Sequence, residues 1–304
     1  MANPAYVAVD WGTSSFRLWL IAEDGSVLGE SRGSEGMTVA AKTGFAEVLA
    51  AHLDKVSAPA DLPVIACGMV GAKQGWVEAG YTDVPATLSS ILTGAVSVPG
   101  QSRDIRILPG LAQRDKASPD VIRGEETQLL GALGAESTGA QAVCMPGTHS
   151  KWVHVTDGKV TGFSTFMTGE LFDVISKHTI LSHAVAGAEE QPADAAAFEA
   201  AVSAAFARPA LASNLLFTAR SGQLLHGISA AAAQARLSGT LIGLEIAGAL
   251  QDAANSDITL VASGRLQALY EQAFKTLSLA FTAIDADAAV RRGLSAAAEA
   301  IWPN

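Results

Sequence analysis

The fold is decided by residues 7–20, which read VAVDWGTSSFRLWL. An apolar run ends at Asp10, passes through a Gly-Thr-Ser-Ser turn at residues 12–15, and becomes apolar again from Phe16. A core strand has no need of a carboxylate followed by three hydroxyl groups. Glycine lets the backbone approach a phosphate closely, and the amides and hydroxyls that follow it can donate hydrogen bonds to phosphate oxygens. The stretch therefore predicts a strand, a turn suited to phosphate and a second strand.

The same arrangement occurs again about 135 residues later, around Gly147. Each copy consists of a strand, a Gly-Thr turn, a second strand, an Asp-Gly hairpin turn and a third strand. The strands are expected at 6–9, 16–21 and 27–30 in the first copy and at 142–145, 151–155 and 160–163 in the second. Two such patterns in the same order indicate a duplicated supersecondary unit.

Two Gly-Thr turns that face each other across a cleft can hold the phosphates of a nucleotide from both sides. Asp10 would then lie where a hydrated Mg²⁺ ion bridges those phosphates. The pattern is neither a Walker P-loop nor a Rossmann turn, because the sequence has no GxxxxGK[ST] and no GxGxxG after a strand. A single turn is as readily explained by a hairpin whose hydroxyls cap their own backbone. The pair, with Asp10 before the first turn and Lys151 after the second, favours phosphate binding.

Composition limits the class of protein. With 304 residues, 49% of them hydrophobic, the chain is long enough for two domains or one large α/β unit. The net charge of −10 and the lack of a run of Lys and Arg argue against a nucleic-acid partner. No apolar segment reaches the roughly 18 residues that a membrane span needs, and the N-terminus does not read as a secretory signal. Cys67 and Cys144 lie in apolar stretches and are expected to be reduced, buried thiols of a cytoplasmic protein.

The second half of the chain is expected to be mostly helical from residue 170. Helices are predicted at 170–182, 194–206, 222–236, 240–254, 264–281 and 286–300. A strand at 258–262 ends in Ser263-Gly264 and opens a helix, which is a common geometry for a nucleotide to rest against. His178 and His183 are five residues apart and do not share a helix face, so no structural metal is expected.

Five stretches together resemble one known family: residues 7–20, GMVGAKQGWVEAGY (68–81), VIRGEETQLLGAL (121–133), MPGTHSKWV (145–153) and FMTGELFDVI (166–175). In this order they are similar to the 2-dehydro-3-deoxygalactonokinases of the actin-like ATPase and sugar-kinase superfamily, over nearly the whole chain. The resemblance implies an α/β fold of two ribonuclease H-like, actin- or hexokinase-like domains with an interdomain cleft. These are expected at 1–120 and 121–304, with a return of the last helix to the first domain left open.

The resemblance also implies an ATP-dependent kinase that transfers the γ-phosphoryl group to O6 of 2-dehydro-3-deoxy-D-galactonate, with Mg²⁺ as cofactor. Asp10 is expected at the water shell of Mg-ATP, and Arg17 either near the phosphates or as a solvated strand arginine. The first phosphate hairpin is expected to comprise Gly12, Thr13, Ser14 and Ser15, and the second Gly147, Thr148, His149, Ser150 and the following Lys151. Ser263, Gly264 and Arg265 are expected at the adenosine.

The acceptor hydroxyl needs a carboxylate to orient it or to take its proton. Sugar kinases of the superfamily carry that acid in a Gly-Asp segment ahead of the second hairpin, and the matching residues here are Gly124, Glu125 and Glu126. Glu126 would point about 100° round the helix from Glu125, so only one is expected to face the cleft, and Glu125 is preferred. The alternative is an ordinary first turn of a helix, where the macrodipole favours Glu.

The stretch 68–76 lies where related sugar kinases contact the sugar. With Gly71 in this loop, Lys73 would meet the acid group, Gln74 a hydroxyl and Trp76 a carbon face. The alternative is a Gly-rich crossover loop with a surface lysine and a core tryptophan. Arg123 is a second candidate cation for the acid group or a phosphate.

Two further functions fit the same residues. One is a phosphatase or ATPase of the same fold, in which residues 125–126 activate water, and the other is a sugar-acid sensor that binds without turnover. Apolar helix faces in the second half of the chain leave a homodimer open. Acceptor-dependent release of ADP separates the kinase from both alternatives.

Overall fold

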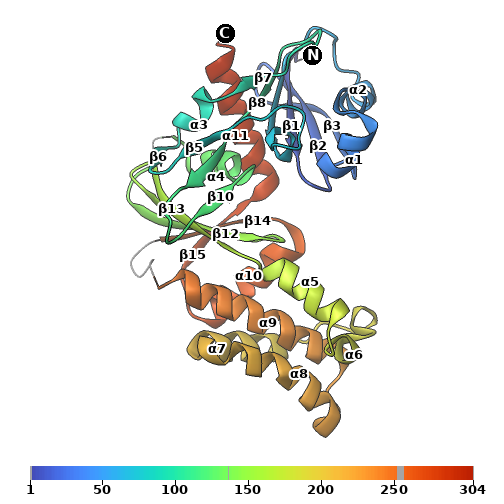
Figure 1. Ribbon diagram of the computed structural model, residues 1–304, viewed down its shortest axis with the longest axis vertical. Coiled ribbons are helices and arrows are strands. Elements are labelled where there is room, and N and C mark those ends of the chain that lie inside the picture. The colour runs from blue at the N-terminus through green and yellow to red at the C-terminus, as the bar shows by residue number, and fades with distance from the viewer. Residues whose placement is uncertain (1, 136, 252–256, 304) are drawn as a thin grey trace. The chain divides into compact units, whose positions relative to one another are not determined.

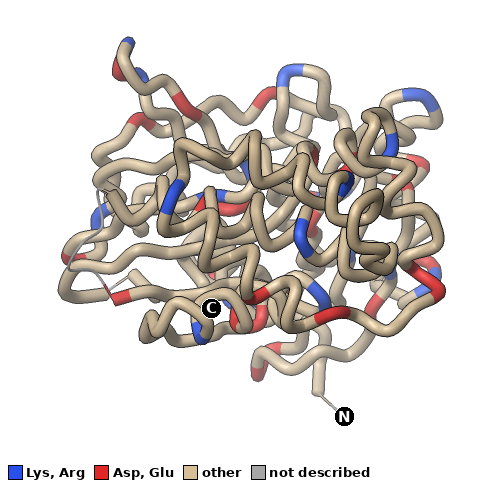
Figure 2. The backbone as a smooth tube through the Cα atoms, turned by 90° about the horizontal axis from the view of Figure 1, so that it is seen from below, with Lys and Arg blue, Asp and Glu red and all other residues tan. Residues whose placement is uncertain are grey.

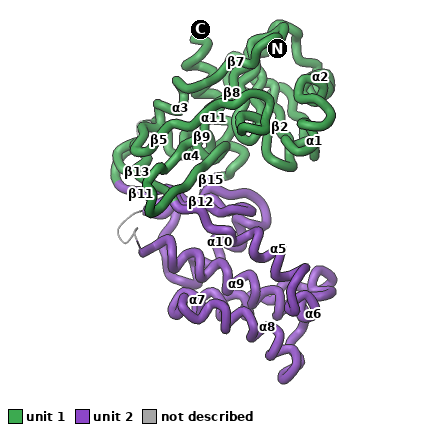
Figure 3. Tube along the Cα trace, in the orientation of Figure 1, with its two compact units in different colours: residues 1–139, 155–163, 285–304 green, residues 140–154, 164–284 purple. Residues whose placement is uncertain are grey.

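The computed structural model describes residues 2–135, 137–251 and 257–303, which form two compact units (Figures 1 and 3). The first unit comprises residues 1–139, 155–163 and 285–304, and the second comprises residues 140–154 and 164–284. This division differs from the expected one at residue 120, because the segment up to residue 139 packs with the N-terminal part. The last helix also belongs to the first unit.

The first unit combines two sheets with several helices. Its elements are β1 (Pro4–Trp11), β2 (Phe16–Ala22), β3 (Val27–Gly33), α1 (Met37–Thr43), α2 (Phe45–Lys55), β4 (Val64–Gly68), η1 (Met69–Gly71), β5 (Tyr81–Asp83), β6 (Ala86–Thr87), α3 (Ser90–Thr93), β7 (Val96–Ser97), β8 (Ile105–Ile107), β9 (Gly110–Gln113), β10 (Asp120–Ile122), α4 (Glu125–Leu133) and α11 (Ala286–Ile301). The main sheet has the order β3-β2-β1-β4-β8-β7, and a smaller sheet has the order β10-β9-β5. Strands β1, β2 and β3 form the predicted antiparallel meander, and β4 joins β1 in parallel.

Alternate residues of the meander point to opposite faces of the main sheet, and both faces are covered. Val9 and Leu18 lie in a core with Leu49 of α2. Trp19 lies on the other face in a second core with Leu294 of α11. Because neither face meets water, β1 and β2 are apolar at nearly every position outside Asp10 and Arg17 instead of alternating.

Helices α4 and α11 cross closely on this second face (Figure 1). A Cβ atom at Gly131 would lie 1.8 Å from the carbonyl oxygen of Ala289, and one at Gly293 would lie 2.0 Å from that of Thr127. Glycine is therefore required on both helices for their backbones to approach. The crossing fixes the start of α4 and the start of α11 against the same sheet.

The second unit combines the repeated meander with a group of helices. Its elements are β11 (Ala140–Met145), β12 (Ser150–Thr156), β13 (Lys159–Phe166), α5 (Thr168–His178), α6 (Ser182–Val185), η2 (Ala188–Glu190), α7 (Ala195–Ala207), η3 (Pro209–Leu211), α8 (Ala212–His226), α9 (Ala230–Ala249), β14 (Asp257–Ala262), α10 (Gly264–Thr276) and β15 (Phe281–Asp285). The strand order is β15-β14-β11-β12-β13, with β14 parallel to β11. The residues of β13 assigned to the first unit pair there with β6.

Two of the predicted helices were wrongly divided. The sequence suggested 222–236 and 240–254, whereas α8 ends at His226 and α9 continues unbroken to Ala249; residues 252–254 lie outside the described residues. Gly227 adopts a left-handed conformation that ends α8, and the Ser229 side chain caps α9. Gly239 does not break α9, because it faces α7, where a Cβ atom would lie 2.5 Å from a backbone oxygen.

The predicted helix at 264–281 was too long, and β15 was missed. Helix α10 ends at Thr276, and Ser278 turns the chain with a positive φ of 57° before β15 begins at Phe281. The helix predicted at 170–182 likewise ends earlier, at His178. The helices predicted at 194–206 and 286–300 are confirmed as α7 and α11.

Both cysteines are free and buried, as predicted. Lys and Arg are spread along the trace among Asp and Glu and form no long basic run (Figure 2). Within the described residues no single helix is long and apolar enough to cross a membrane. Only α7 taken together with residues 209–226 passes that test, and this pair is bent by 114°.

Candidate active site

The first Gly-Thr turn forms a tight hairpin between β1 and β2. The N–H of Gly12 donates to the carbonyl oxygen of Ser15 at 2.9 Å. A Cβ atom at Gly12 would lie 2.8 Å from Ser15 Oγ, so a larger residue would force this side chain to move. Thr13, Ser14 and Ser15 are exposed at the tip. The four residues predicted for the first phosphate hairpin therefore lie together on one turn.

Backbone hydrogen bonds from the start of α1 hold this hairpin in place. Met37 N–H donates to the carbonyl oxygen of Gly12 at 2.9 Å, and Thr38 N–H donates to that of Thr13 at 3.1 Å. A Cβ atom at Gly36 would lie 2.5 Å from the hairpin backbone. These contacts use the hairpin's carbonyl groups and fix the conformation of its tip.

The second Gly-Thr turn, between β11 and β12, is held in the same way. Glu170 N–H in the first turn of α5 donates to the carbonyl oxygen of Thr148 at 2.9 Å. A Cβ atom at Gly169 would lie 2.5 Å from the carbonyl oxygen of Gly147. Thr148 and His149 are exposed at the tip. The duplication therefore includes the bracing helix as well as the strands.

The remaining residues of the second hairpin point in different directions. His149 Nε2 lies 2.6 Å from a carboxylate oxygen of Glu170, and both side chains are half-exposed. Lys151 is buried and its Nζ donates to the carbonyl oxygen of His149 at 2.9 Å. Ser150 is fully buried, with its Oγ 3.1 Å from the hydroxyl oxygen of Tyr270. The hydroxyl of Ser150 is thus directed into the protein, and the exposed tip consists of the residues before it.

Asp10 lies at the carboxyl end of β1, and its side chain is buried. Arg17 is its cross-strand neighbour. One guanidinium nitrogen of Arg17 is 2.5 Å from Asp10 Oδ2, and another pairs with Asp287 in the first turn of α11. Arg32 also pairs with Asp287, at 2.6 Å. Arg17 therefore bridges two carboxylates. It is not the solvated strand arginine of the alternative interpretation.

The charges around Asp10 suit a cation. Burial raises the pKa of Asp10; the charge of Arg17 opposes the rise, and the carboxylates of Glu125 and Asp287 add to it. A divalent cation would relieve this repulsion. No group of three or more His, Cys, Asp or Glu residues in the described chain is arranged to ligate a metal. The residues present therefore fit Mg²⁺ bound through one carboxylate, water and substrate phosphates.

The start of α4 lies at the edge of the sheet that carries Asp10, because Gly68 and Gly124 allow the two backbones to pack closely against each other. Gly68, at the end of β4, and Gly124, ahead of α4, have φ angles of 91° and 103°. A Cβ atom at Gly124 would lie 3.3 Å from the Cα of Gly68, and one at Gly68 would lie 2.7 Å from the carbonyl oxygen of Trp11. Parallel strands β1 and β4 end at the same edge, so this contact sets α4 beside it.

The two glutamates at the start of α4 have different surroundings. Glu126 is fully buried and accepts hydrogen bonds from Gly124 N–H at 2.7 Å and from the Thr127 hydroxyl at 3.1 Å. Burial, and then the charge of Glu125, raises the pKa of Glu126 to about 8. Glu125 is only half-buried and accepts from Arg123 N–H at 3.1 Å. Of the two carboxylates, Glu125 is the one that solvent and a ligand can reach.

The predicted sugar-binding segment is partly exposed. Lys73 and Gln74 are exposed in the loop after η1, and Gly71 is buried. Trp76 is half-buried and stacks on Phe45, with ring centroids 6.0 Å apart. Much of the Trp76 ring therefore packs in the core, as the alternative interpretation expected, while Lys73 and Gln74 face solvent.

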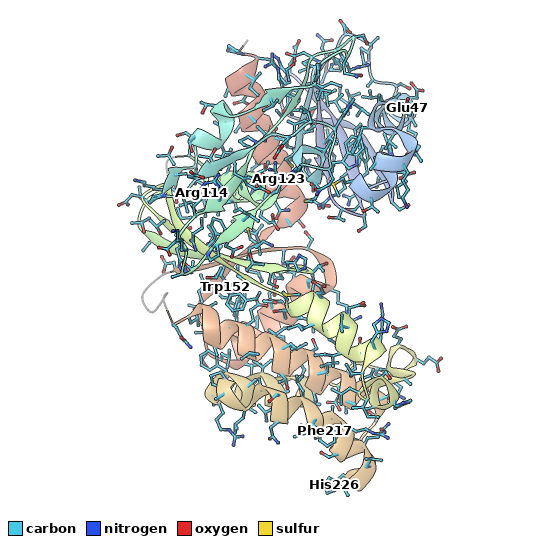
Figure 4. All side chains as sticks on the ribbon, viewed as in Figure 1. Glu47, Arg114, Arg123, Trp152, Phe217 and His226 are labelled. Atoms are coloured by element: carbon cyan, nitrogen blue, oxygen red, sulfur yellow. The ribbon has the colours of Figure 1, made fainter. Side chains whose placement is uncertain are left out.

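Arg123 lies close to this segment (Figure 4). Its guanidinium group stacks 4.3 Å above the ring of Tyr81 and donates to the carbonyl oxygen of Gly80 at 2.8 Å. Its Nε and Nη1 atoms are buried and have no hydrogen-bond partner in the described part of the chain. A Cβ atom at Gly71 would lie 3.0 Å from Nη1. Arg123 therefore has donors to offer beside the predicted sugar-binding loop.

A cavity of about 220 Å³ lies beside the second hairpin within the second unit. It is lined by Gly147, Thr168, Gly169, Phe172, Ser238, Leu241, Ile242, Arg265, Leu266, Leu269 and Tyr270. Of the residues predicted at the adenosine, Arg265 lines the cavity. Gly264 begins α10 next to it with a φ of 62°, and Ser263 precedes that glycine. The cavity runs from hairpin backbone to α10, with largely apolar walls.

Several residues of these two sites were not predicted. Asp287 and Tyr270 lie far in sequence from the residues they contact, and no local pattern marks them. Gly36 and Gly169 had a detectable signal, because each lies at the start of the helix that follows the third strand of its copy. Comparing the two copies beyond their strands would have found both glycines.

The two units with their repeated meanders have the α/β architecture that the sequence predicted for a sugar kinase of the actin-like ATPase superfamily. The family model described as 2-keto-3-deoxy-galactonokinase matches residues 10–297. The chain belongs to this family, and it is accordingly a phosphotransferase with an alcohol group as acceptor.

Similar proteins support this assignment. The chain is 64% identical over 299 residues to the Rhizobium meliloti (strain 1021) protein named probable 2-dehydro-3-deoxygalactonokinase DgoK1, covering 98% of each chain. It is 37% identical over 298 residues to the 2-dehydro-3-deoxygalactonokinase of Escherichia coli (strain K12), covering 97% of this chain and 98% of that protein. A crystal structure of a Sinorhizobium meliloti protein, assigned as a 2-dehydro-3-deoxygalactonokinase, matches with a TM-score of 0.94 and 63% identity, covering 98% of this chain and 100% of that one.

Proposed function

We propose that this kinase uses ATP and Mg²⁺ to phosphorylate O6 of 2-dehydro-3-deoxy-D-galactonate in the catabolism of galactonate. The observation that carries the proposal is the pair of braced Gly-Thr hairpins, one of which follows the buried carboxylate of Asp10. The names of the relatives supply the acceptor. The two free, buried thiols are in keeping with action in the cytoplasm.

The second unit is proposed to bind the nucleotide. The cavity beside α10 has apolar walls for a base, and Arg265 supplies a cation at its edge. The exposed amides of Thr148 and His149 lie at the hairpin next to the cavity and would bind phosphate oxygens. Gly264 allows α10 to begin beside this site with its positive φ.

The first unit is proposed to bind the acceptor and to supply the other hairpin to the phosphates. Lys73 and Arg123 are the cations available for the acid group, and Gln74 would bind a hydroxyl. Mg²⁺, when bound at Asp10 through water, neutralises charge on the phosphates. Arg17 keeps the Asp10 carboxylate in one orientation through its second contact with Asp287.

Glu125 is proposed to orient the acceptor hydroxyl and to take its proton. The acceptor oxygen forms a bond to the γ-phosphorus while the bond from that phosphorus to the β–γ bridging oxygen breaks, and ADP leaves. Glu125 suits this role because it is the reachable carboxylate of the pair, whereas Glu126 is used to cap α4. Positioning contributes most in such a loose transition state, so the rigid start of α4 matters as much as basicity.

The test is a coupled assay of ADP release with Mg-ATP and a panel of keto-deoxy sugar acids, followed by ³¹P NMR of the product. We expect release to depend on 2-dehydro-3-deoxy-D-galactonate and the product to be a phosphomonoester at O6. Release that does not depend on any acceptor would instead favour an ATPase or phosphatase. Binding of the acid without release of ADP would favour a sensor.

A further inference from the structure

We propose that Glu245 of α9 positions the second phosphate hairpin through Tyr270 and Ser150, and that it thereby sets the affinity of the second unit for the nucleotide. The inference rests on the proposed function, in which this hairpin and the adjacent cavity bind ATP. Glu245 is a positioning residue, because it contacts the hairpin from within the protein, through the side chains of Tyr270 and Ser150.

Glu245 is a buried carboxylate that the proposed reaction does not use. It is 1% exposed, and no Lys or Arg in the described residues forms an ion pair with it. Trp152 Nε1 donates to its Oε1 at 2.9 Å, and the Tyr270 hydroxyl donates to its Oε2 at 2.6 Å (Figure 4 labels Trp152). The Thr168 hydroxyl is a further donor to this carboxylate. A buried acid without a cation is costly, and an apolar residue of similar size would often be more stable.

The hydrogen bonds from Glu245 to the hairpin have a defined direction. The Tyr270 hydroxyl donates its single proton to Glu245. Ser150 Oγ lies 3.1 Å from the oxygen of Tyr270, and its hydroxyl also forms a hydrogen bond with the Glu245 carboxylate itself. The Ser150 oxygen in turn lies 3.4 Å from Gly147 N, where it accepts the amide proton. Glu245 is thus the last acceptor of a chain that begins in the hairpin backbone, and such chains strengthen cooperatively.

The same carboxylate also connects the walls of the proposed nucleotide cavity. Tyr270 and Thr168 line that cavity, as does Gly147 of the hairpin. Thr168 begins α5, whose next residue, Gly169, packs on the hairpin. Without the Glu245 carboxylate, the hairpin, the start of α5 and the face of α10 that carries Tyr270 would therefore no longer be linked by hydrogen bonds. The exposed amides of the hairpin would then be less well ordered for phosphate.

The experiment compares two variants that each remove one donor to Glu245. Tyr270→Phe removes the donor that also contacts Ser150 of the hairpin and keeps the ring, whereas Trp152→Phe removes a different donor and leaves the Tyr270 and Ser150 hydroxyls in place. Isothermal titration with ADP and Mg²⁺ gives the nucleotide Kd, and steady-state kinetics give KM for ATP and for the acceptor. We expect Tyr270→Phe to raise the Kd for ADP and the KM for ATP about tenfold. The acceptor KM should change less than twofold.

Trp152→Phe is expected to lower the unfolding midpoint at least as much as Tyr270→Phe does and to leave the Kd for ADP within twofold. Glu245→Gln should raise the Kd for ADP as Tyr270→Phe does. The Gln amide has only one oxygen to accept hydrogen bonds from donors that now use both carboxylate oxygens. Equal effects of Tyr270→Phe and Trp152→Phe on the Kd for ADP would overturn the inference, since burial of the network alone would then explain them.

A fourth variant separates this inference from the proposed function. Leu269→Trp fills the cavity and leaves every hydrogen-bonding side chain of the Glu245 network unchanged. If Leu269→Trp abolishes binding of ADP while both Tyr270→Phe and Glu245→Gln leave it unchanged, the nucleotide site stands and the positioning role of Glu245 is refuted. If Leu269→Trp leaves binding of ADP unchanged, both the nucleotide site and the inference are refuted.

Discussion

The buried carboxyl group of Glu126 makes the stability of the protein depend on pH in a direction that is unusual for an acid. In the unfolded chain the group has its ordinary pKa of 4.5, and in the folded chain burial raises the pKa to about 8. Between these values the unfolded chain has lost the proton that the folded chain still holds. The contribution of Glu126 is therefore most favourable below pH 4.5 and is lost as the pH rises toward 8.

The size of the effect follows from the two pKa values. Between pH 5.0 and pH 7.5 this one group lowers the free energy of unfolding by about 3 kcal/mol. Glu126→Gln removes the titration and keeps an oxygen that can accept from Gly124 N–H. The stability of the variant relative to the wild type should therefore increase by about 3 kcal/mol over the same interval.

The assay is urea unfolding followed by tryptophan fluorescence at pH 5.0, 6.25 and 7.5. Glu125→Gln is the comparison variant: it keeps the Glu126 carboxyl and removes the neighbouring charge that contributes to the raised pKa of Glu126, so its stability relative to the wild type should increase by less than that of Glu126→Gln. If the wild type and Glu126→Gln lose or gain stability in parallel over this range, Glu126 does not hold its proton in the folded state and the account of its burial is wrong.

Three further predictions concern packing, the acceptor and the reaction. Gly293→Ala should lower the free energy of unfolding by at least about 2 kcal/mol in thermal or urea unfolding, because its Cβ would lie 2.0 Å from the carbonyl oxygen of Thr127; an unchanged midpoint would contradict the close crossing of α4 and α11. Lys73→Met should raise the acceptor KM about tenfold and leave the KM for ATP unchanged in steady-state kinetics, since its charge would bind the acid group; an equal rise in both constants would argue against that placement. Glu125→Gln should reduce kcat at least about 100-fold while calorimetry shows unchanged binding of ADP, and a larger loss in Glu126→Gln would reverse the assignment of the two carboxylates.

The meanders and their turns could be predicted from the sequence because the signals are local. The run of apolar residues around Asp10, the glycine after it and the Asp-Gly turn each act within a few positions. The repetition around Gly147 then supplied the evidence for a duplicated unit. These strands are confirmed by the structure.

The helical division of the second half could not be predicted in the same way. Gly239 looks like a helix breaker in the sequence, yet it lies inside α9 because the backbone of α7 passes too close for a Cβ atom. Gly227, which lies inside the predicted helix 222–236, ends α8 by its left-handed conformation. The two glycines differ only in their tertiary surroundings, which no local pattern records.

The charged and hydrogen-bonded partners of the site residues could not be predicted from the sequence for a related reason. The sequence leaves Arg17 either near the phosphates or as a solvated strand arginine, because its partner Asp287 is 270 residues away in sequence. Glu245 is likewise far in sequence from Ser150, with which it interacts both directly and through Tyr270. Such contacts depend on which helix covers which face of a sheet, and this becomes known only when the chain is folded.

The central claim is that Asp10 and the two hairpins handle the phosphates of Mg-ATP during transfer to a sugar acid. Single-turnover transfer from ATP to 2-dehydro-3-deoxy-D-galactonate in Asp10→Asn tests it most directly, with folding checked by circular dichroism. The account predicts a rate at least about 1,000-fold below that of the wild type, because the carboxylate that would hold the hydrated cation is lost. A rate within a few-fold of the wild type in a folded Asp10→Asn variant would contradict it.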